Sequence, residues 1–170
     1  MARCWLGLNS SGQTSVEFLF IFMIMLFYLQ IVIQPNVQDA SESIIAVNRI
    51  GQAKMNAMKL ANAVNEVTAL GGESSKSIWL FLGDGTSVWC DEADKEIKYK
   101  ATVGVNLAEE FNSCTDLGGG KHECEGAIKV LDDTTLNCNN FTLKEGSLVP
   151  KARVRIYKIG DTTYVQDLLG

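Results

Sequence analysis

The sequence predicts an α+β fold in which a long N-terminal helix is followed by a mostly antiparallel β head. Three observations predict it: an uncharged apolar run over residues 18–33, an amphipathic pattern after that run, and a change to alternation with turn residues from Ser77 onward. We expect an apolar helix over 13–34, an amphipathic helix over 35–72 and the β-rich head over 73–170.

The composition limits the classes of function. The chain has 170 residues, of which 46% are hydrophobic, and 15 Lys plus Arg against 20 Asp plus Glu give a net charge of −5. General disorder is therefore excluded, and the absence of a basic run argues against nucleic acid as a partner. The single histidine, His122, leaves little scope for imidazole chemistry, so we expect no enzyme activity and no cofactor.

The apolar run is of the membrane-inserted type. Its sixteen residues contain one polar side chain, Gln30, and at about 1.5 Å per residue they cover roughly 24 Å as a helix. A secretory signal peptide is the alternative, but no A-x-A-like cleavage site follows the run. Arg3 before the run and Asp39 and Glu42 after it predict a cytoplasmic N-terminus and an external head.

One acidic residue, Glu17, lies directly before the apolar run. An ionised and unpaired carboxylate near hydrocarbon is costly, by roughly 2.5–3.5 kcal/mol at a helix centre and less near an end, and intramembrane acids are usually functional. Glu17 belongs to a short motif, Gly12-Gln13-x-Ser15-x-Glu17, that immediately precedes the apolar residues.

This motif followed by an unbroken apolar helix resembles archaeal type IV pilins and pilin-like proteins that have a class III signal peptide. The resemblance covers about a sixth of the chain, from Gly12 to roughly Gln38. It departs from the family at Ser10 and Ser11, where many members carry Lys or Arg. The resemblance implies that a prepilin-peptidase-like enzyme cuts between Gly12 and Gln13 and removes residues 1–12 as the signal peptide.

The resemblance also implies a type IV pilin-like fold and a function. The chain would be a structural subunit of a surface filament that presents the β head for adhesion or surface contact. Its partners would be copies of itself, the peptidase, an assembly ATPase with its membrane platform, and the membrane that holds the precursor. Glu17 would pair with the amino terminus of a neighbouring subunit. The helix residues that take part in assembly would be Ser15, Glu17, Phe18, Phe20, Phe22 and Phe27.

Other functions are open at this point. The chain would alternatively be a minor pilin or pseudopilin of a secretion or uptake machine, an archaellin of a motility filament, or a non-assembling membrane-tethered binding protein. The archaellin alternative ranks lower because archaellin processing sites are usually followed by small and glycine-rich residues, unlike Thr14-Ser15-Val16-Glu17. An ordinary anchor with an incidental Glu17 is the simplest alternative.

The segment after the apolar run predicts an amphipathic helix. Asp39-Ala40-Ser41-Glu42 has the spacing of a capping box, which predicts a helix start, and Gly71-Gly72 predicts its end. Pro35 predicts a kink or a locally opened turn. Because the pattern is too irregular for a strict heptad, we expect packing under the head rather than a coiled coil. The expected apolar face comprises Ile44, Val47, Ile50, Met58, Ala61, Val64 and Val67.

The head reads as strands separated by turns. Gly83-Asp84-Gly85 and Gly160-Asp161 are expected to be hairpin connections, and Gly118-Gly119-Gly120 a loop. Trp79 and Trp89 are expected to be core or helix-packing residues rather than a ligand platform. The expected strands are 78–82, 86–90, 96–105, 127–131, 141–143, 153–159 and 163–168.

Four cysteines lie in the head, and in an external domain they predict two disulfides. Three pairings are possible, and the sequence does not choose among them; we favour Cys114 with Cys124 and Cys90 with Cys138. A metal site at these cysteines and His122 is disfavoured, because the spacing contains no C-x-x-C pair. Asn140-Phe141-Thr142 is a glycosylation sequon.

Two acidic clusters in the head are expected to be solvated loops. They are Asp91, Glu92 and Asp94, and Asp132 and Asp133, and their spacing does not match an EF-hand.

Overall fold

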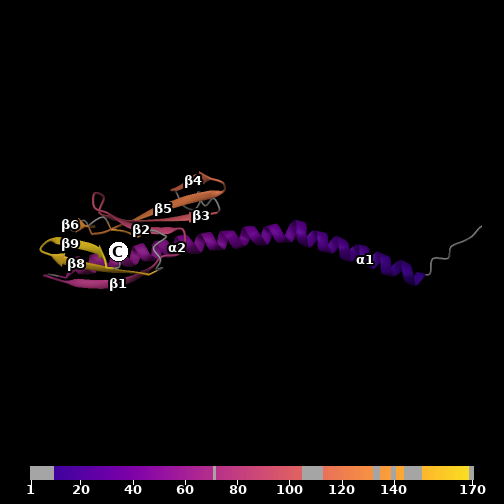
Figure 1. Ribbon diagram of the computed structural model, residues 1–170, viewed down its shortest axis with the longest axis horizontal. Coiled ribbons are helices and arrows are strands. Elements are labelled where there is room, and N and C mark those ends of the chain that lie inside the picture. Colours follow the sequence, from indigo (N-terminus) through magenta and orange to yellow (C-terminus); the bar gives the residue numbers. More distant parts are fainter. Residues whose placement is uncertain are drawn as a thin grey trace, which may run out of the picture. The chain divides into compact units, whose positions relative to one another are not determined.

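The computed structural model describes residues 10–70, 72–104, 113–131, 135–138, 141–143 and 151–168. It has the predicted α+β architecture, with a long N-terminal helix followed by a mostly antiparallel β domain (Figure 1). The chain divides into two compact units, one up to Ser41 and one from Glu42 onward.

The first unit is helical from Ser10. It contains α1 (Ser10–Tyr28), a five-residue π-helical turn η1 (Leu29–Ile33) and the first residues of α2 (Gln34–Ala69). The large apolar side chains of residues 16–33 are between 39% and 71% exposed. The described side chains of this unit, from Val16 onward, therefore form an apolar surface and no apolar core.

The π-helical turn lies directly before Pro35. Proline lacks an N–H and its ring collides with the carbonyl four residues earlier in a regular α-helix. The chain widens here, because the Gln34 N–H donates to the Leu29 carbonyl five residues back, and the Asn36 side chain donates to the Val32 carbonyl at 2.5 Å. This is the locally opened turn expected at Pro35.

The predicted helix start at residues 39–42 is wrong, because these residues lie in the interior of α2. The helix enters this region already formed, so it has no free N–H groups for a capping box to satisfy. Its C-terminal end lies as expected, one residue before Leu70. There the Ser74 hydroxyl donates to the Val67 carbonyl and Lys158 donates to the Thr68 carbonyl, which satisfies two of the last carbonyls of the helix.

The second unit contains two β-sheets. One has four strands in the order β1-β8-β9-β6, and the other has five in the order β4-β5-β3-β2-β7. All pairs are antiparallel except β6 with β9. The strands are β1 (Ser75–Phe81), β2 (Thr86–Asp91), β3 (Glu96–Val103), β4 (Cys114–Gly118), β5 (Lys121–Lys129), β6 (Thr135–Asn137), β7 (Thr142–Leu143), β8 (Lys151–Ile159) and β9 (Thr162–Asp167).

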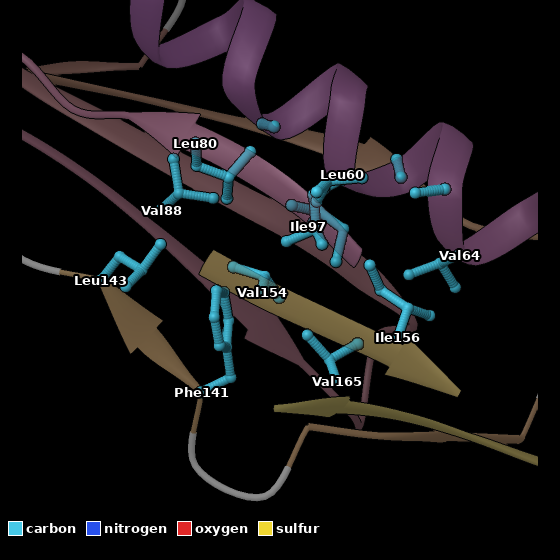
Figure 2. Close-up of a cluster of buried hydrophobic side chains, with 14 of the residues drawn as sticks. Leu60, Val64, Leu80, Val88, Ile97, Phe141, Leu143, Val154, Ile156 and Val165 are labelled. Atoms are coloured by element: carbon cyan, nitrogen blue, oxygen red, sulfur yellow. The ribbon is translucent and has the colours of Figure 1, made fainter. Parts of the chain in front are cut away.

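The core of this unit joins α2 to both sheets. Figure 2 shows Leu60 and Val64 of α2 gathered with Ile97 of β3 and Ile156 of β8, and all four side chains are fully buried. The helix residues of the seam follow one another in steps of three and four, so they lie along one side of α2. They are Ala46, Ile50, Ala53, Ala57, Leu60, Val64 and Val67.

This seam corrects part of the predicted apolar face of α2. Ile44, Val47 and Met58 are 70%, 49% and 45% exposed. Several of the buried positions of the helix are instead occupied by alanines, Ala46, Ala53 and Ala57. Alanine lets a helix lie close to a sheet but gives a weak hydrophobic signal. The expectation that the helix packs under the head is confirmed, and the spacing of the seam is more regular than the sequence indicated.

The turns of the head agree only in part with expectation. Gly160 joins β8 to β9, which pair as a hairpin. Gly83-Asp84-Gly85 is not a hairpin connection, because β1 pairs with β8 while β2 pairs with β3 and β7. The glycines at 118–120, expected as a loop, connect the hairpin of β4 and β5 with positive φ at all three positions.

Candidate functional site

The motif that precedes the apolar run lies in α1. Gly12, Gln13 and Ser15 are helical in their backbone, and their side chains lie outside the described part of the structure. Glu17 is exposed, as are the four phenylalanines expected to take part in assembly, Phe18, Phe20, Phe22 and Phe27, at 53–71%. Within the isolated chain this end of the helix is therefore an apolar surface with a carboxylate at its beginning.

The helix is long and apolar enough to cross a membrane. Burying one large apolar side chain is worth roughly 1.5–3 kcal/mol, so a run of exposed residues from Val16 to Ile33 strongly favours a non-aqueous environment. The apolar helix thus fits a membrane-inserted segment or a signal sequence.

A second apolar surface lies on the part of α2 that belongs to the head unit. Ile44, Val47, Met55 and Met58 are 45–71% exposed, and with Gly51 they follow one another in steps of three and four along the helix. We call Ile44, Val47, Gly51, Met55 and Met58 the outer stripe. Because none of them belongs to the buried seam, α2 has one apolar side in the head core and another open to solvent.

The four head cysteines form two disulfides with the pairing favoured above. Cys114 and Cys124 face each other across β4 and β5, while Cys90 of β2 is bonded to Cys138, directly after β6. The second bond therefore joins the five-stranded sheet to the four-stranded one. Structural disulfides form in oxidising compartments, so they indicate that the head lies outside the cytoplasm.

The first acidic cluster lies in an exposed turn, as expected, and its carboxylates are also hydrogen-bonded. Lys98 donates to Asp91 and to Asp94, each at 2.7 Å, and the Asp91 carboxylate also accepts the backbone N–H groups of Ala93 and Asp94. The hydrogen bond from Lys98 is the main reason that the pKa of Asp91 lies below its ordinary value. Glu92 accepts the N–H of Cys138 at 2.6 Å, so the cluster forms the turn between β2 and β3 and braces the cross-sheet disulfide.

The remaining expected sites are not assembled into a chemical centre by the described residues. His122 is half-buried on β5 opposite Val103, and among the described residues no three His, Cys, Asp or Glu side chains are placed to hold a metal ion. Asn140, Asp132 and Asp133 lie outside the described residues.

One surface of the head was not found by sequence reasoning. Trp79, expected to be a core or helix-packing residue, is 45% exposed and Phe81 is 52% exposed on the outward side of β1. Their register partners on β8 are Arg153 and Lys151. The signal was present in the alternation of β1, where the buried Ile78 and Leu80 leave Trp79 on the opposite face.

We call this outward surface of β1, β8 and β9 the cationic face. The Lys151 ammonium lies 5.6 Å from the centre of the Phe81 ring, the Arg153 guanidinium 5.8 Å from Trp79, and the Arg155 guanidinium 5.5 Å from Tyr157. Tyr157 also stacks on Tyr164 of β9 at 5.1 Å. Its charged and aromatic members are Trp79, Phe81, Lys151, Arg153, Arg155, Tyr157 and Tyr164.

Comparison with known proteins identifies no relative. No protein-family model matches the chain, and neither a curated protein nor a solved structure matches it.

Proposed function

We propose that the chain is a structural subunit of a surface filament of the archaeal type IV pilus kind, which assembles through its N-terminal apolar helix and presents the β head outside the cell. A prepilin-peptidase-like enzyme would first cut between Gly12 and Gln13. The precursor would be held in the membrane, and an assembly ATPase with its membrane platform would then add the subunit to the filament.

The observation that carries this proposal is the pair of apolar surfaces on the helices. A simple membrane anchor accounts for the exposed residues 16–33, because lipid would cover them. It gives no reason for the outer stripe, which begins at Ile44, eleven residues or about 16 Å further along a helix. Helices of neighbouring subunits would cover both surfaces in a filament.

Gly51 in the outer stripe supports helix-to-helix contact. A glycine inside a helix costs about 1 kcal/mol relative to alanine. Here a Cβ would meet no atom within 4 Å, so nothing in the described part of the chain requires the glycine. Small residues on a helix surface let another helix approach closely. Close packing of a helix from a neighbouring subunit would explain why a glycine occupies this position.

Glu17 gives the proposal its sharpest test. A filament core without lipid or water leaves a carboxylate in need of a cation, and the amino terminus of a neighbouring subunit would supply it.

The first measurement is peptide mapping of the native protein by mass spectrometry. A first residue at Gln13, free or cyclised, is expected; a start at Met1 or beyond Ile33 would contradict the proposal.

The second measurement is the yield of sheared filaments from cells that make Glu17→Ala or Glu42→Ala. Both glutamates are exposed on the isolated helix, and Glu42 lies well outside the apolar run. We expect Glu17→Ala to reduce filament yield at least tenfold while the membrane-held subunit persists, and Glu42→Ala to leave the yield within twofold. Normal filaments from Glu17→Ala would sink the pairing role of Glu17.

A filament yield in which this chain is a trace component would instead favour a minor pilin or pseudopilin. Absence of the chain from every filament fraction would favour the membrane-tethered binding protein.

A further inference from the structure

The cationic face differs in charge from the rest of the chain. The whole chain has 20 acidic and 15 basic residues, yet β1 and β8 contain no acid at all. The one acid of β9, Asp167, is in register with Val154, which points into the core. The described outward surface of these three strands therefore carries Lys151, Arg153 and Arg155 with no acidic residue among them.

The groups on this face are arranged in two rows. Along β1 the aromatic rings of Trp79 and Phe81 alternate with buried residues, and along β8 the three cations do the same. Residues two apart on a strand are about 7 Å apart, and neighbouring strands are about 4.8 Å apart. Figure 1 shows β1, β8 and β9 side by side, as their pairing requires. A flat row of rings beside a row of cations matches an extended ligand with repeated acidic groups.

The contacts with aromatic rings restrict the motion of the cations before a ligand binds. A cation beside an aromatic ring is held by the ring electrons and loses less freedom when a ligand arrives. A guanidinium held in this way keeps N–H donors for a carboxylate or sulfate, which it binds with two parallel hydrogen bonds. Trp79 and Phe81 keep about half of their surface open beside the cations.

The neutral groups on the face favour a sugar polymer over nucleic acid. Ser75, Ser77 and Gln166 lie among the cations, Ser77 and Gln166 being the register partners of Arg155 on its two sides. Hydroxyl and amide groups suit the hydroxyls of sugars. Single-stranded nucleic acid instead requires several ring faces open for base stacking, whereas Tyr157 and Tyr164 stack on each other.

The face is also hollowed at one end. Arg155, Lys158, Tyr157, Ser75 and Gln166 line a shallow depression together with Glu73 and Ser74 of the turn after α2, so two cations and one acid border it. A terminal or branching sugar would fit such a depression, with a carboxylate directed to Arg155.

We propose that the cationic face binds an acidic polysaccharide, a glycan chain bearing carboxylate or sulfate groups. The sugar rings would lie along Trp79 and Phe81 while their acidic groups pair with Lys151, Arg153 and Arg155. This deepens the proposed function, since it names the class of surface that the head would contact, and a filament would present many copies of a weak site and raise the avidity.

The test uses the full chain in detergent, so that filament assembly is not needed. Binding to immobilised alginate and dextran sulfate is measured by interferometry, with neutral dextran, oligo(dT) and a second copy of the chain as comparison ligands. The variant is Arg153→Gln with Arg155→Gln. The matched control is Lys121→Gln with Lys129→Gln, which removes the same charge from two exposed positions on β5.

We expect the wild-type chain to bind both acidic polymers and not neutral dextran, with affinity that falls as salt screens the charges. The arginine variant should bind at least tenfold more weakly, because it loses the charge-assisted hydrogen bonds of two guanidinium groups. The lysine control should stay within twofold. Trp79→Leu should also weaken binding severalfold, and thermal unfolding should show that all variants fold.

Four results would overturn the proposal: no binding to either acidic polymer, an equal loss of binding in the lysine control, stronger binding to oligo(dT), or stronger binding to a second copy of the chain that the arginine variant loses. Filament yield of the arginine variant, measured separately, distinguishes the two proposals. If the arginine variant forms normal filaments but no longer binds polysaccharide, the cationic face is not needed for assembly. If the chain binds polysaccharide but forms no filaments, the binding proposal stands and the filament proposal is rejected.

Discussion

At the scale of single residues, Tyr99 packs directly against Gly126 in the head. They are register partners on β3 and β5, and the Tyr99 ring covers the glycine so closely that a Cβ at 126 would overlap the ring. Tyr99 is 8% exposed, and burial raises the pKa of its hydroxyl. The glycine is needed here to make room for the ring, not to adopt an unusual backbone conformation.

Gly126→Ala is therefore expected to lower the free energy of unfolding by about 1–3 kcal/mol, the usual cost of overpacking. Denaturation with tryptophan fluorescence would measure this. The ring should also be pushed toward solvent, so the pKa of Tyr99 should move back toward its ordinary value of 10.0. Tyr99→Leu combined with Gly126→Ala should cost less than the sum of the two single changes, since the overlap is gone; strict additivity would contradict the packing argument.

Asp91 makes the stability of the head sensitive to acid. Its folded-state pKa lies below the ordinary 3.8, first because of the hydrogen bond from Lys98. A group with a lowered folded-state pKa stabilises the protein above its unfolded pKa, and this contribution is lost as the pH falls through the folded value. Wild type should therefore exceed Asp91→Asn in unfolding free energy above about pH 5, and the difference should shrink below about pH 4.

The pH series is compared with Asp84→Asn, a change at an exposed aspartate between β1 and β2. A constant difference between wild type and Asp91→Asn from neutral pH down to about pH 2 would contradict the role given to Lys98.

At the scale of elements, α2 has two apolar sides with different uses. The buried seam packs in the head, whereas the outer stripe has no described contact that explains Gly51. Gly51→Ala and Gly51→Leu should both stabilise the isolated chain by up to about 1 kcal/mol, because both residues are better helix formers.

The effects of these two substitutions on assembly should differ. If a neighbouring helix approaches at Gly51, the leucine substitution should abolish filaments and the alanine substitution should reduce them less, in proportion to the added volume. The measurements are sheared-filament yield and thermal unfolding in detergent. Equal filament yield from the wild type, Gly51→Ala and Gly51→Leu would show that the outer stripe is not a packing surface.

The same helix shows what sequence reasoning can and cannot reach. Its end near residue 70 followed from Gly71 and Gly72, whereas its start was misplaced and its buried side was assigned partly to Ile44, Val47 and Met58. A search for hydrophobic periodicity gives most weight to large apolar residues, whereas many of the α2 residues in the head core are alanines. A sequence does not state which of two apolar sides faces the domain and which faces a partner.

The strands, too, were predicted only in part. β8 and β9 were found because Val154 and Ile156 alternate with charged residues and Gly160 marks their turn. β4 was missed because Cys114-Thr115-Asp116-Leu117-Gly118 has no alternation, and β6 because its parallel pairing with β9 depends on contacts distant in sequence. Of the candidate sites, the cysteines were found, while the cationic face required knowledge of which strands are neighbours.

At the scale of the whole molecule, the two disulfides should contribute unequally to stability. Cys90 and Cys138 are 48 residues apart in sequence, and Cys114 and Cys124 are 10 apart. Loop-closure entropy predicts about 4 kcal/mol for the longer loop and about 3 kcal/mol for the shorter one. Cys90→Ala with Cys138→Ala should thus destabilise the head more than the other pair of changes, as measured by chemical denaturation, and the reverse order would contradict the entropic account.

The order of the cysteines along the chain also determines how the head would respond to tension. The Cys114–Cys124 loop lies inside the stretch closed by Cys90 and Cys138. Fully extended, a separation of 48 residues corresponds to about 160 Å of contour length. The Cys90–Cys138 bond prevents a pulling force from extending this stretch. An unfolded head that stays oxidised would therefore extend about 160 Å less than a fully reduced one. Reduction of the Cys114–Cys124 bond alone would not lengthen it, because that bond lies inside the stretch closed by Cys90 and Cys138.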